Sequence, residues 1–345
     1  MAYSTITKPG LYFNTKLYTG NGTTDHSITG VGFQPDWTWL KKRNNVDDHI
    51  LQDVVRTATK YLISNSNAAE ATYAEGFKSF DSDGFTLGNA NNTNQNTHTF
   101  VAWNWKANGA GSSNSSGSIT STVSVNTTAG FSIVKYTGTG GTETVGHGLG
   151  VTPKMIMVKN LDSSENWGVW HTAIAANKYL GLNQTNAVAT NTAIWNNTLP
   201  TNAVFSIGNN ARTGGSDNYV AYCFANVKGY SRFDSYIGNG NANGSFIYTG
   251  FKPIFVMIKK TNATSSWTMW DNKRSSNENN IPLYANLNNA ESAQTTVKLD
   301  LLSNGFKIRG NGSNVNTSGS TYVYMAFAEE PLVANVGQSI PATAQ

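Results

Sequence analysis

The chain has 345 residues, a net charge of +4 and only 13% charged residues. Its basic residues are scattered apart from Lys41, Lys42 and Arg43, whereas nucleic-acid binding needs a basic stripe interleaved with aromatic residues, so that function is not expected. The single cysteine, Cys223, excludes an internal disulfide and a cysteine metal cluster. No signal-peptide pattern and no run of about 18 apolar residues occurs, which predicts a protein made in a cytoplasm without membrane insertion.

The chain repeats one set of elements three times. Each repeat opens with a strand that ends in Tyr-x-Gly-x-Gly, at residues 11–20, 131–138 and 231–238. The glycines indicate a turn that needs a positive φ or a close approach of the backbone. A period of roughly 100 residues is too long for a solenoid and suits a complete small domain.

In the first repeat, the apolar strand 37–42 follows a proline, and the closing strand is 97–105. Asp53 and Arg56 are spaced to form a pair across a bend, and Asp83-Gly84 predicts a hairpin. After this repeat, residues 108–130 are rich in Gly, Ser and Thr, a composition that predicts a flexible linker.

The second repeat has the strands 131–138, 155–160 and 217–225, but His171 stands where an Asp-x-x-Arg pattern is expected. Its middle loops are the part of the chain that departs most from the other two repeats.

The third repeat has the strands 231–238, 254–260 and 320–328. It restores the charged pair as Asp271 and Arg274, and the hairpin signal as Asn304-Gly305.

These elements predict an all-β protein of three tandem jelly-roll-like β-sandwich modules, because short alternating strands are separated by turn signals and no amphipathic helix exceeds two turns. The expected organisation is a first module at 1–107, a linker at 108–130, a second module at 131–229, a third at 230–332 and a C-terminal tail at 333–345.

The sequence predicts no enzyme, no cofactor and no metal site. What recurs in the repeats is aromatic residues, glycine and proline, which build architecture, rather than a nucleophile with a base or a matched carboxylate pair. Asp81-Ser82-Asp83 resembles the start of a calcium loop, but the glycine comes too early and no glutamate closes the set.

The candidate contacts for a host glycan lie in the divergent middle of the second repeat: Trp195, Asn196, Asn197 and Trp167. A tryptophan face can stack on a sugar ring while amides bond its hydroxyl groups. The alternative is that each tryptophan belongs to the core, and for Trp195, which has no counterpart in the other repeats, both interpretations stay open.

The repeated phrases resemble those of modular structural proteins of marine bacteriophages, of the cyanophage and pelagiphage kind. The resemblance rests on LYTGNGTTDHSITGVGFQPDWTWLKKR, SFDSDGFTLG, VAYCFANVKGYSRFDSYIGNG, YTGFKPIFVMIKK and YVYMAFAEEPL, and it covers most of the first and third repeats and the junction of the second and third. It implies a tail-fibre or other virion structural protein, and it supplies no catalytic residues.

The functional hypothesis is therefore a non-enzymatic virion protein, made in the host cytoplasm, that acts as a tail-associated fibre or adhesin and contacts host surface glycan. The alternative is a capsid-exterior decoration protein or another tail component without a receptor role. Expected partners are other virion proteins and further copies of the chain. A trimer is favoured because three chains can bury the flat apolar faces that a lone sandwich leaves exposed.

Overall fold

The structure is a computed structural model, and it describes residues 4–275 and 278–331. Antiparallel β-sheets make up almost all of its regular secondary structure, which confirms the all-β prediction. The helical elements are a 3-10 turn η1, Pro9–Leu11, and a single turn α1, Asn91–Asn94. Neither of these helices could cross a membrane. The predicted tail, 333–345, lies outside the described residues.

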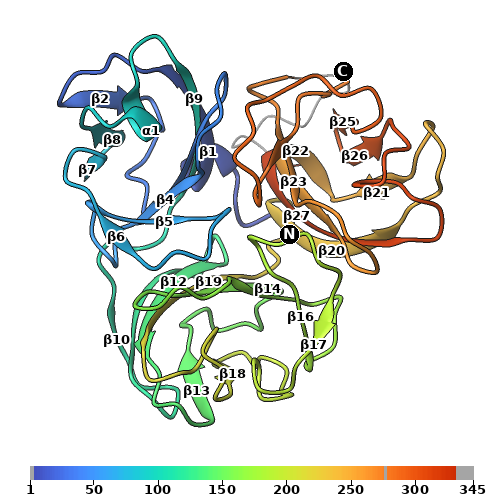
Figure 1. Cartoon of the computed structure of the whole chain (residues 1–345). Coiled ribbons are helices and arrows are strands. Elements are labelled where there is room, and N and C mark those ends of the chain that lie inside the picture. Colours follow the sequence, from blue (N-terminus) through green and yellow to red (C-terminus); the bar gives the residue numbers. More distant parts are fainter. Residues whose placement is uncertain (1–3, 276–277, 332–345) are drawn as a thin grey trace.

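The strands fall into three consecutive groups, which appear as the three lobes of Figure 1. The first group contains β1 Phe13–Thr19, β2 His26–Thr29, β3 Trp37–Lys42, β4 Ile50–Asp53, β5 Lys60–Ile63, β6 Ala71–Thr72, β7 Phe77–Asp81, β8 Gly84–Leu87 and β9 Thr99–Trp105. The second contains β10 Ser112–Asn114, β11 Ser121–Asn126, β12 Phe131–Thr137, β13 Glu143–Gly146, β14 Met155–Asn160, β15 Gly168–His171, β16 Lys178–Tyr179, β17 Ala189–Thr190, β18 Val204–Ile207 and β19 Asn218–Phe224. The third contains β20 Ser231–Ile237, β21 Phe246–Tyr248, β22 Phe251–Lys260, β23 Thr268–Asp271, β24 Leu283–Tyr284, β25 Leu299–Leu302, β26 Gly305–Ile308 and β27 Thr321–Pro331.

Each group has a large sheet with the same strand order. The opening strand pairs with the closing strand, and the closing strand pairs on its other side with the apolar strand: β1-β9-β3, β12-β19-β14 and β20-β27-β22. In the third group, Pro253 lies inside the apolar strand, at a shift in its register with β27. Smaller sheets accompany them, β2-β8-β7 in the first group, β13-β18 and β16-β17 in the second and β21-β26-β25 in the third. The repeated phrases of the sequence thus form equivalent strands. The number of modules and the jelly-roll type stay predictions.

The Tyr-x-Gly motif has the same role in each group. The hydroxyl groups of Tyr18, Tyr136 and Tyr236 each donate a 2.7 Å hydrogen bond to a carbonyl oxygen in the segment before the closing strand. The first glycine of the motif is needed for close approach, since a Cβ at Gly20 would stand 2.2 Å from the carbonyl oxygen of Gln95. The second glycine, for example Gly22, has a positive φ.

The segment predicted as a flexible linker is part of a sheet. β11 pairs antiparallel with β12 along its whole length, from Ser121 opposite Tyr136 to Asn126 opposite Phe131, and β10 pairs with β11. The composition of 108–130 suggested a linker, but Val123 is buried and Val125 packs against the same core, so alternate residues of β11 face inward. The linker prediction is therefore wrong for this segment.

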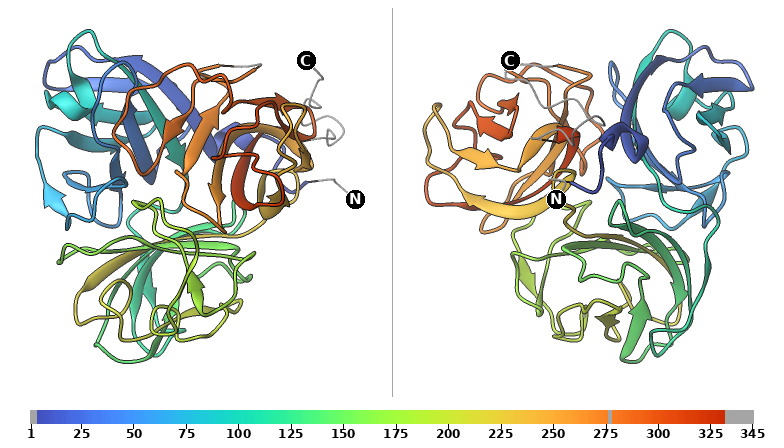
Figure 2. Two further views of the ribbon diagram at one scale, coloured as in Figure 1. Left: turned by 45° about the vertical axis from the view of Figure 1, so that its right-hand side comes forward. Right: turned by 180° about the vertical axis from the view of Figure 1, so that it is seen from behind.

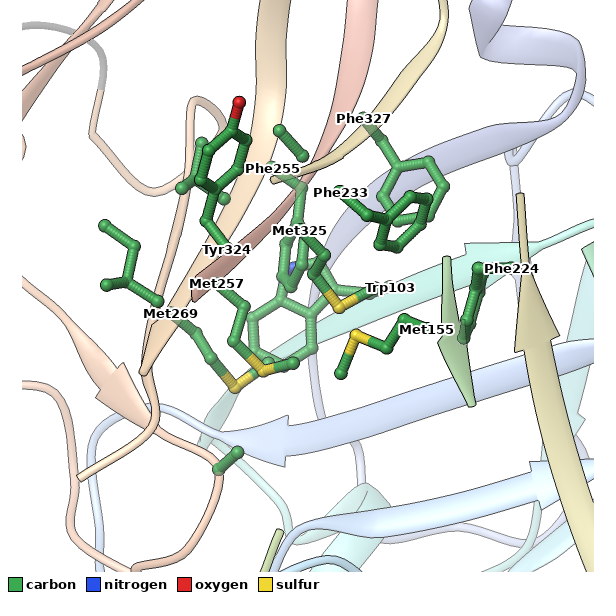
Figure 3. Packing of buried hydrophobic residues seen from close by; sticks show 14 of the residues in the cluster. Trp103, Met155, Phe224, Phe233, Phe255, Met257, Met269, Tyr324, Met325 and Phe327 are labelled. Carbon is green, nitrogen blue, oxygen red and sulfur yellow. The ribbon is translucent and has the colours of Figure 1, made fainter. Parts of the chain in front are cut away.

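The main hydrophobic core lies between the groups. One buried cluster draws residues from all three, including Trp37 and Trp103 from the first, Met157 and Phe224 from the second and Phe255 and Phe327 from the third. Figure 3 shows Trp103, Met155 and Phe255 together in this cluster. Each of the first two groups also has a core of its own on the other face of its large sheet. The large sheets are therefore buried on both faces, which explains why their central strands read as continuous apolar runs.

The three groups close into a ring. The backbone N–H of Glu70 donates to Leu161 O at 2.9 Å, that of Val188 to Thr261 O at 2.7 Å, and that of Glu291 to Arg43 O at 2.8 Å. These bonds join the first group to the second, the second to the third and the third back to the first. Both views in Figure 2 agree with this arrangement, in which every lobe touches the other two.

Candidate functional site

Ionisable residues gather at the contacts between groups, which we call seams. At the seam of the first and second groups, the Arg56 guanidinium bonds the Asp53 carboxylate at 2.5 Å and the Glu70 carboxylate at 3.0 Å. The hydroxyl of Tyr222, on the closing strand of the second group, donates to Asp53 at 2.7 Å. Asp53, Arg56 and Tyr222 are all buried, so the network satisfies two charges that would otherwise be costly to bury.

The seam of the third and first groups repeats this chemistry. Arg274 bonds Asp271 at 2.6 Å and Glu291 at 3.3 Å, and the indole N–H of Trp103 donates to Asp271 at 3.1 Å. Trp103 occupies the same position on β9 that Tyr222 occupies on β19. Glu291 also bonds Arg43 at 2.7 Å. The pairing of Asp and Arg across a bend, predicted at both places, is confirmed.

The remaining seam uses His171. This histidine ends β15 as Asp53 ends β4, and its Nε2 lies 3.1 Å from the carbonyl oxygen of Tyr324 on the closing strand of the third group. Burial lowers the pKa of His171 to about 4, so the neutral ring donates its Nε2–H to that carbonyl near pH 7. All three seams thus join the end of the strand that pairs with the apolar strand, β4, β15 or β23, to the closing strand of the next group.

A buried lysine recurs at the end of each apolar strand, as Lys41, Lys159 and Lys259. Burial lowers the pKa of each ammonium to about 8. Their Nζ atoms donate to backbone carbonyls, for example Lys159 to Asn160 O at 2.7 Å and Lys259 to Ser265 O at 2.6 Å. Sequence reasoning missed these residues, although a lysine directly after the apolar run of all three strands was a visible signal.

The tryptophans predicted to contact glycan are part of the core. Trp195 is 2% exposed and packs in the inner cluster of the second group, and Trp167 is fully buried. The indole N–H of Trp167 donates to Ile63 O at 3.0 Å, so this ring belongs to the seam with the first group. Neither ring presents a face on which a sugar could stack, and the prediction is wrong for both residues. The reason is that Asn196 and Asn197, the polar neighbours of Trp195, are exposed on a turn, whereas the Trp195 ring itself packs in the core.

Asn196 and Asn197 are exposed, with φ angles of 48° and 47°. This left-handed conformation suits asparagine, and the turn is closed by hydrogen bonds from Asn197 N to Thr192 O and from Thr198 N to Trp195 O. These amides are exposed, whereas the rings of Trp195 and Trp167, with which they were predicted to bind a sugar, are buried. Their role as glycan contacts stays a prediction.

Two neighbouring surface depressions lie beside the connection between the second and third groups, and they share Asn226, Val227 and Lys228. One, of about 550 Å³, is lined by Thr5, Thr127, Thr128, Gly130, Val151, Asn226, Val227 and Lys228. The other, of about 500 Å³, is lined by Asn226, Val227, Lys228, Gly229, Ser231, Arg232, Tyr248, Thr249 and Gly250. Together they present hydroxyl groups, amides and cations beside the half-exposed ring of Tyr248. Within the described ranges, no cluster of three or more His, Cys, Asp or Glu side chains could hold a metal ion.

Comparison with curated proteins gives no match. A family model described as a domain of unknown function, DUF7483, matches residues 8–331, a range that includes all three groups of strands and every seam between them. One family model thus spans the whole ring. The chain belongs to the DUF7483 family.

Proposed function

We propose that the protein is a non-enzymatic structural component of a bacteriophage virion, and that it acts on the tail as an adhesin that contacts host surface glycan. The resemblance of its repeated phrases to marine phage structural proteins supports the first part. The observation that carries the second part is the pair of depressions around Asn226–Lys228. Their hydroxyl, amide and ammonium groups suit sugar hydroxyls and acidic substituents, and an aromatic ring beside polar groups is a common arrangement in small-molecule sites.

The buried ionisable residues favour a non-enzymatic role. The Asp53 and Asp271 networks and His171 join one group to the next, and their polar atoms are satisfied by other parts of the ring. These side chains stabilise the contacts between sheets. None of them lines the two depressions, whose hydroxyl, amide and cationic groups are suited to binding.

The ring also bears on oligomerisation. The trimer was favoured because it would bury flat apolar faces of separate sandwiches, and in this chain those faces pack against the other two groups. Assembly with other virion proteins would then use the outer surface. A compact body of this kind also suits a decoration protein, which keeps that alternative open to test.

Binding to host polysaccharide tests the adhesin proposal. We expect the purified protein to bind it at micromolar concentration, and Tyr248→Ala to weaken binding about tenfold. Tyr73→Ala is the matched control, since Tyr73 is 47% exposed in the first group and Tyr248 is 48% exposed beside the depression. Replacing both Asn196 and Asn197 by glycine, which tolerates their φ angles, tests the second candidate contact.

Immunogold labelling of intact particles tests the position. Label at the tail supports the adhesin, whereas label spread over the capsid indicates decoration. Failure of the wild-type protein to bind host polysaccharide would remove the receptor role.

A further inference from the structure

Three equivalent loops follow the Tyr-x-Gly motifs, and a buried amide closes two of them. In the first group, Nδ2 of Asn94 donates to Thr23 O at 2.9 Å and to Gly88 O at 2.8 Å. In the third, Nδ2 of Asn316 donates to Asn241 O at 2.7 Å and to Gly310 O at 3.0 Å. An NH₂ group surrounded by oxygen acceptors thus fills the centre of each loop.

The second group lacks this amide. Gly214 O accepts a 3.1 Å hydrogen bond from Gly140 N, as the carbonyl oxygen of Asn94 accepts one from Gly22 N at 2.8 Å, so Gly214 occupies the position of the asparagine. The carbonyl oxygen of Gly208 lies 2.0 Å from the point where a Cβ of residue 214 would stand. A backbone oxygen therefore points into the space that the amide takes in the other groups.

A buried carboxylate belongs to the same loop. Glu143 is 7% exposed, and neither of its carboxylate oxygens has a hydrogen-bond partner among the described residues. Glu143 pairs with Ile207 as His26 pairs with Leu87, and Nδ1 of His26 lies 2.7 Å from the amide oxygen of Asn94. Glu143 thus occupies a position from which a side chain reaches the loop centre. An unpaired charge at such a depth is costly unless a positive ion compensates it.

Further oxygen approaches the carboxylate. A Cβ at Gly141 would stand 3.3 Å from Oε1 of Glu143 and 3.4 Å from Oγ1 of Thr139, so both oxygens lie near one point beside a residue without a side chain. Carboxylate, hydroxyl and carbonyl oxygens are the ligands of hard cations such as Ca²⁺. We infer that the loop of residues 138–143 binds a hard cation, with Glu143 supplying the negative charge and Thr139 and Gly208 supplying neutral oxygens.

The sequence predicts no metal site, because its single cysteine excludes a cysteine cluster and the calcium-like start at Asp81-Ser82-Asp83 is not completed by a glutamate. The inferred site differs from such a cluster in using one carboxylate with neutral oxygens, and it became visible only when the three loops were compared.

Tb³⁺ luminescence tests the inference, since Tb³⁺ occupies Ca²⁺ sites and nearby tyrosine can sensitise its emission. Tyr136 and Tyr219 stack at 5.2 Å at the base of this loop. We expect emission that Ca²⁺ displaces at about 0.1–1 mM, loss of that emission in Glu143→Gln and its retention in Glu165→Gln, which removes the same charge elsewhere in the second group.

Thermal unfolding of the wild-type protein gives a second measurement that needs no variant. At constant ionic strength, about 10 mM Ca²⁺ should raise Tm by about 1–3 °C. Stabilisation by Na⁺ or Mg²⁺ in place of Ca²⁺ would also support a cation site and would identify its ion. If no cation changes Tm and Tb³⁺ emission is equal in the wild type and Glu143→Gln, the inference is wrong.

Discussion

The seam at Asp53 and the seam at His171 stand at the same place in the repeated architecture but use different chemistry. At the first, a carboxylate accepts hydrogen bonds from Arg56 and from the Tyr222 hydroxyl of the next group. At the second, a neutral imidazole donates to a backbone carbonyl of the next group.

The residue across each seam explains the difference. Tyr222 and Trp103 carry an O–H and an N–H that can donate to a carboxylate, whereas the equivalent residue of the third group is Met325, which cannot. An aspartate at position 171 would face the carbonyl oxygen of Tyr324, which cannot donate a hydrogen bond to it. Histidine supplies the donor that this seam needs. The residue at the end of the strand and the residue opposite it on the next group therefore have to change together.

Replacing Arg56 should break the charged seam most severely. Arg56→Ala leaves the buried Asp53 carboxylate without its ion partner, and we expect a loss of about 3–5 kcal/mol in the free energy of unfolding. Denaturant unfolding measures it. The control is Arg232→Ala, which removes a half-exposed pair with Asp234 and should cost at most about 1 kcal/mol. Similar losses in both variants would contradict the importance given to the seam.

Placing a carboxylate at the histidine seam should lower the free energy of unfolding slightly less than Arg56→Ala does. His171→Asp places a carboxylate opposite the Tyr324 carbonyl, and we expect a loss of about 3 kcal/mol in unfolding free energy. His171→Asn retains an N–H donor and should lose about 1 kcal/mol. If the aspartate variant were as stable as the asparagine variant, the seams would be interchangeable.

The stability of the histidine seam should also depend on pH. The pKa of His171 is lowered by burial to about 4, while its unfolded value is near 6.5, so between these pH values the unfolded chain binds more protons and stability rises with pH. The contribution of the neutral His171 to folding stability is fully present above pH 6.5. Acidification to pH 4 should remove up to about 3 kcal/mol of the free energy of unfolding. Burial also lowers the pKa of His49 and His147, so the test is the difference in slope between the wild type and His171→Asn. Equal slopes would show that His171 does not titrate in this window.

Replacing a buried lysine should change the free energy of unfolding least, and it should raise stability rather than lower it. Lys159 carries a positive charge at pH 7 because its pKa, lowered by burial, is about 8. Lys159→Met removes the cost of burying that charge, and we expect a gain of about 1–2 kcal/mol at pH 7.

The gain should shrink between pH 8 and 10, because the wild-type lysine is neutral when folded and charged when unfolded, which stabilises the folded state as pH rises. The partly exposed Lys135 gives the control, Lys135→Met, which should change stability by less than about 0.5 kcal/mol. A loss of stability in Lys159→Met would mean that the hydrogen bond to Asn160 O outweighs the cost of burial.

Much of the fold was predictable because its signals are local. Alternation and turn residues located β1, β3, β9 and their equivalents, and the hairpins at Asp83-Gly84 and Asn304-Gly305 form as β7–β8 and β25–β26. The spacing of Asp53 and Arg56 was enough to predict their pair, because both lie on one bend. In contrast, the composition of 108–130 concealed the alternation of Val123 and Val125 in β11.

The candidate site was predicted poorly because burial depends on the packing of distant segments. Polar neighbours made Trp195 look exposed, and no local signal tells that its ring packs in an inner core. Likewise, the depressions around Asn226–Lys228 are formed by Thr5, Thr127 and Tyr248, which lie far apart in the chain.

The sequence alone determined that the protein is an all-β repeat with equivalent strands, because strand periodicity and turn chemistry act over a few residues. Only the tertiary structure decided that the repeats close into one ring around a shared core, that the seams need matched donors and acceptors, and that the Glu143 carboxylate has no hydrogen-bond partner within residues 4–275 and 278–331. Those outcomes depend on which surfaces meet, and contacts such as Arg43 with Glu291 join residues that no local rule connects.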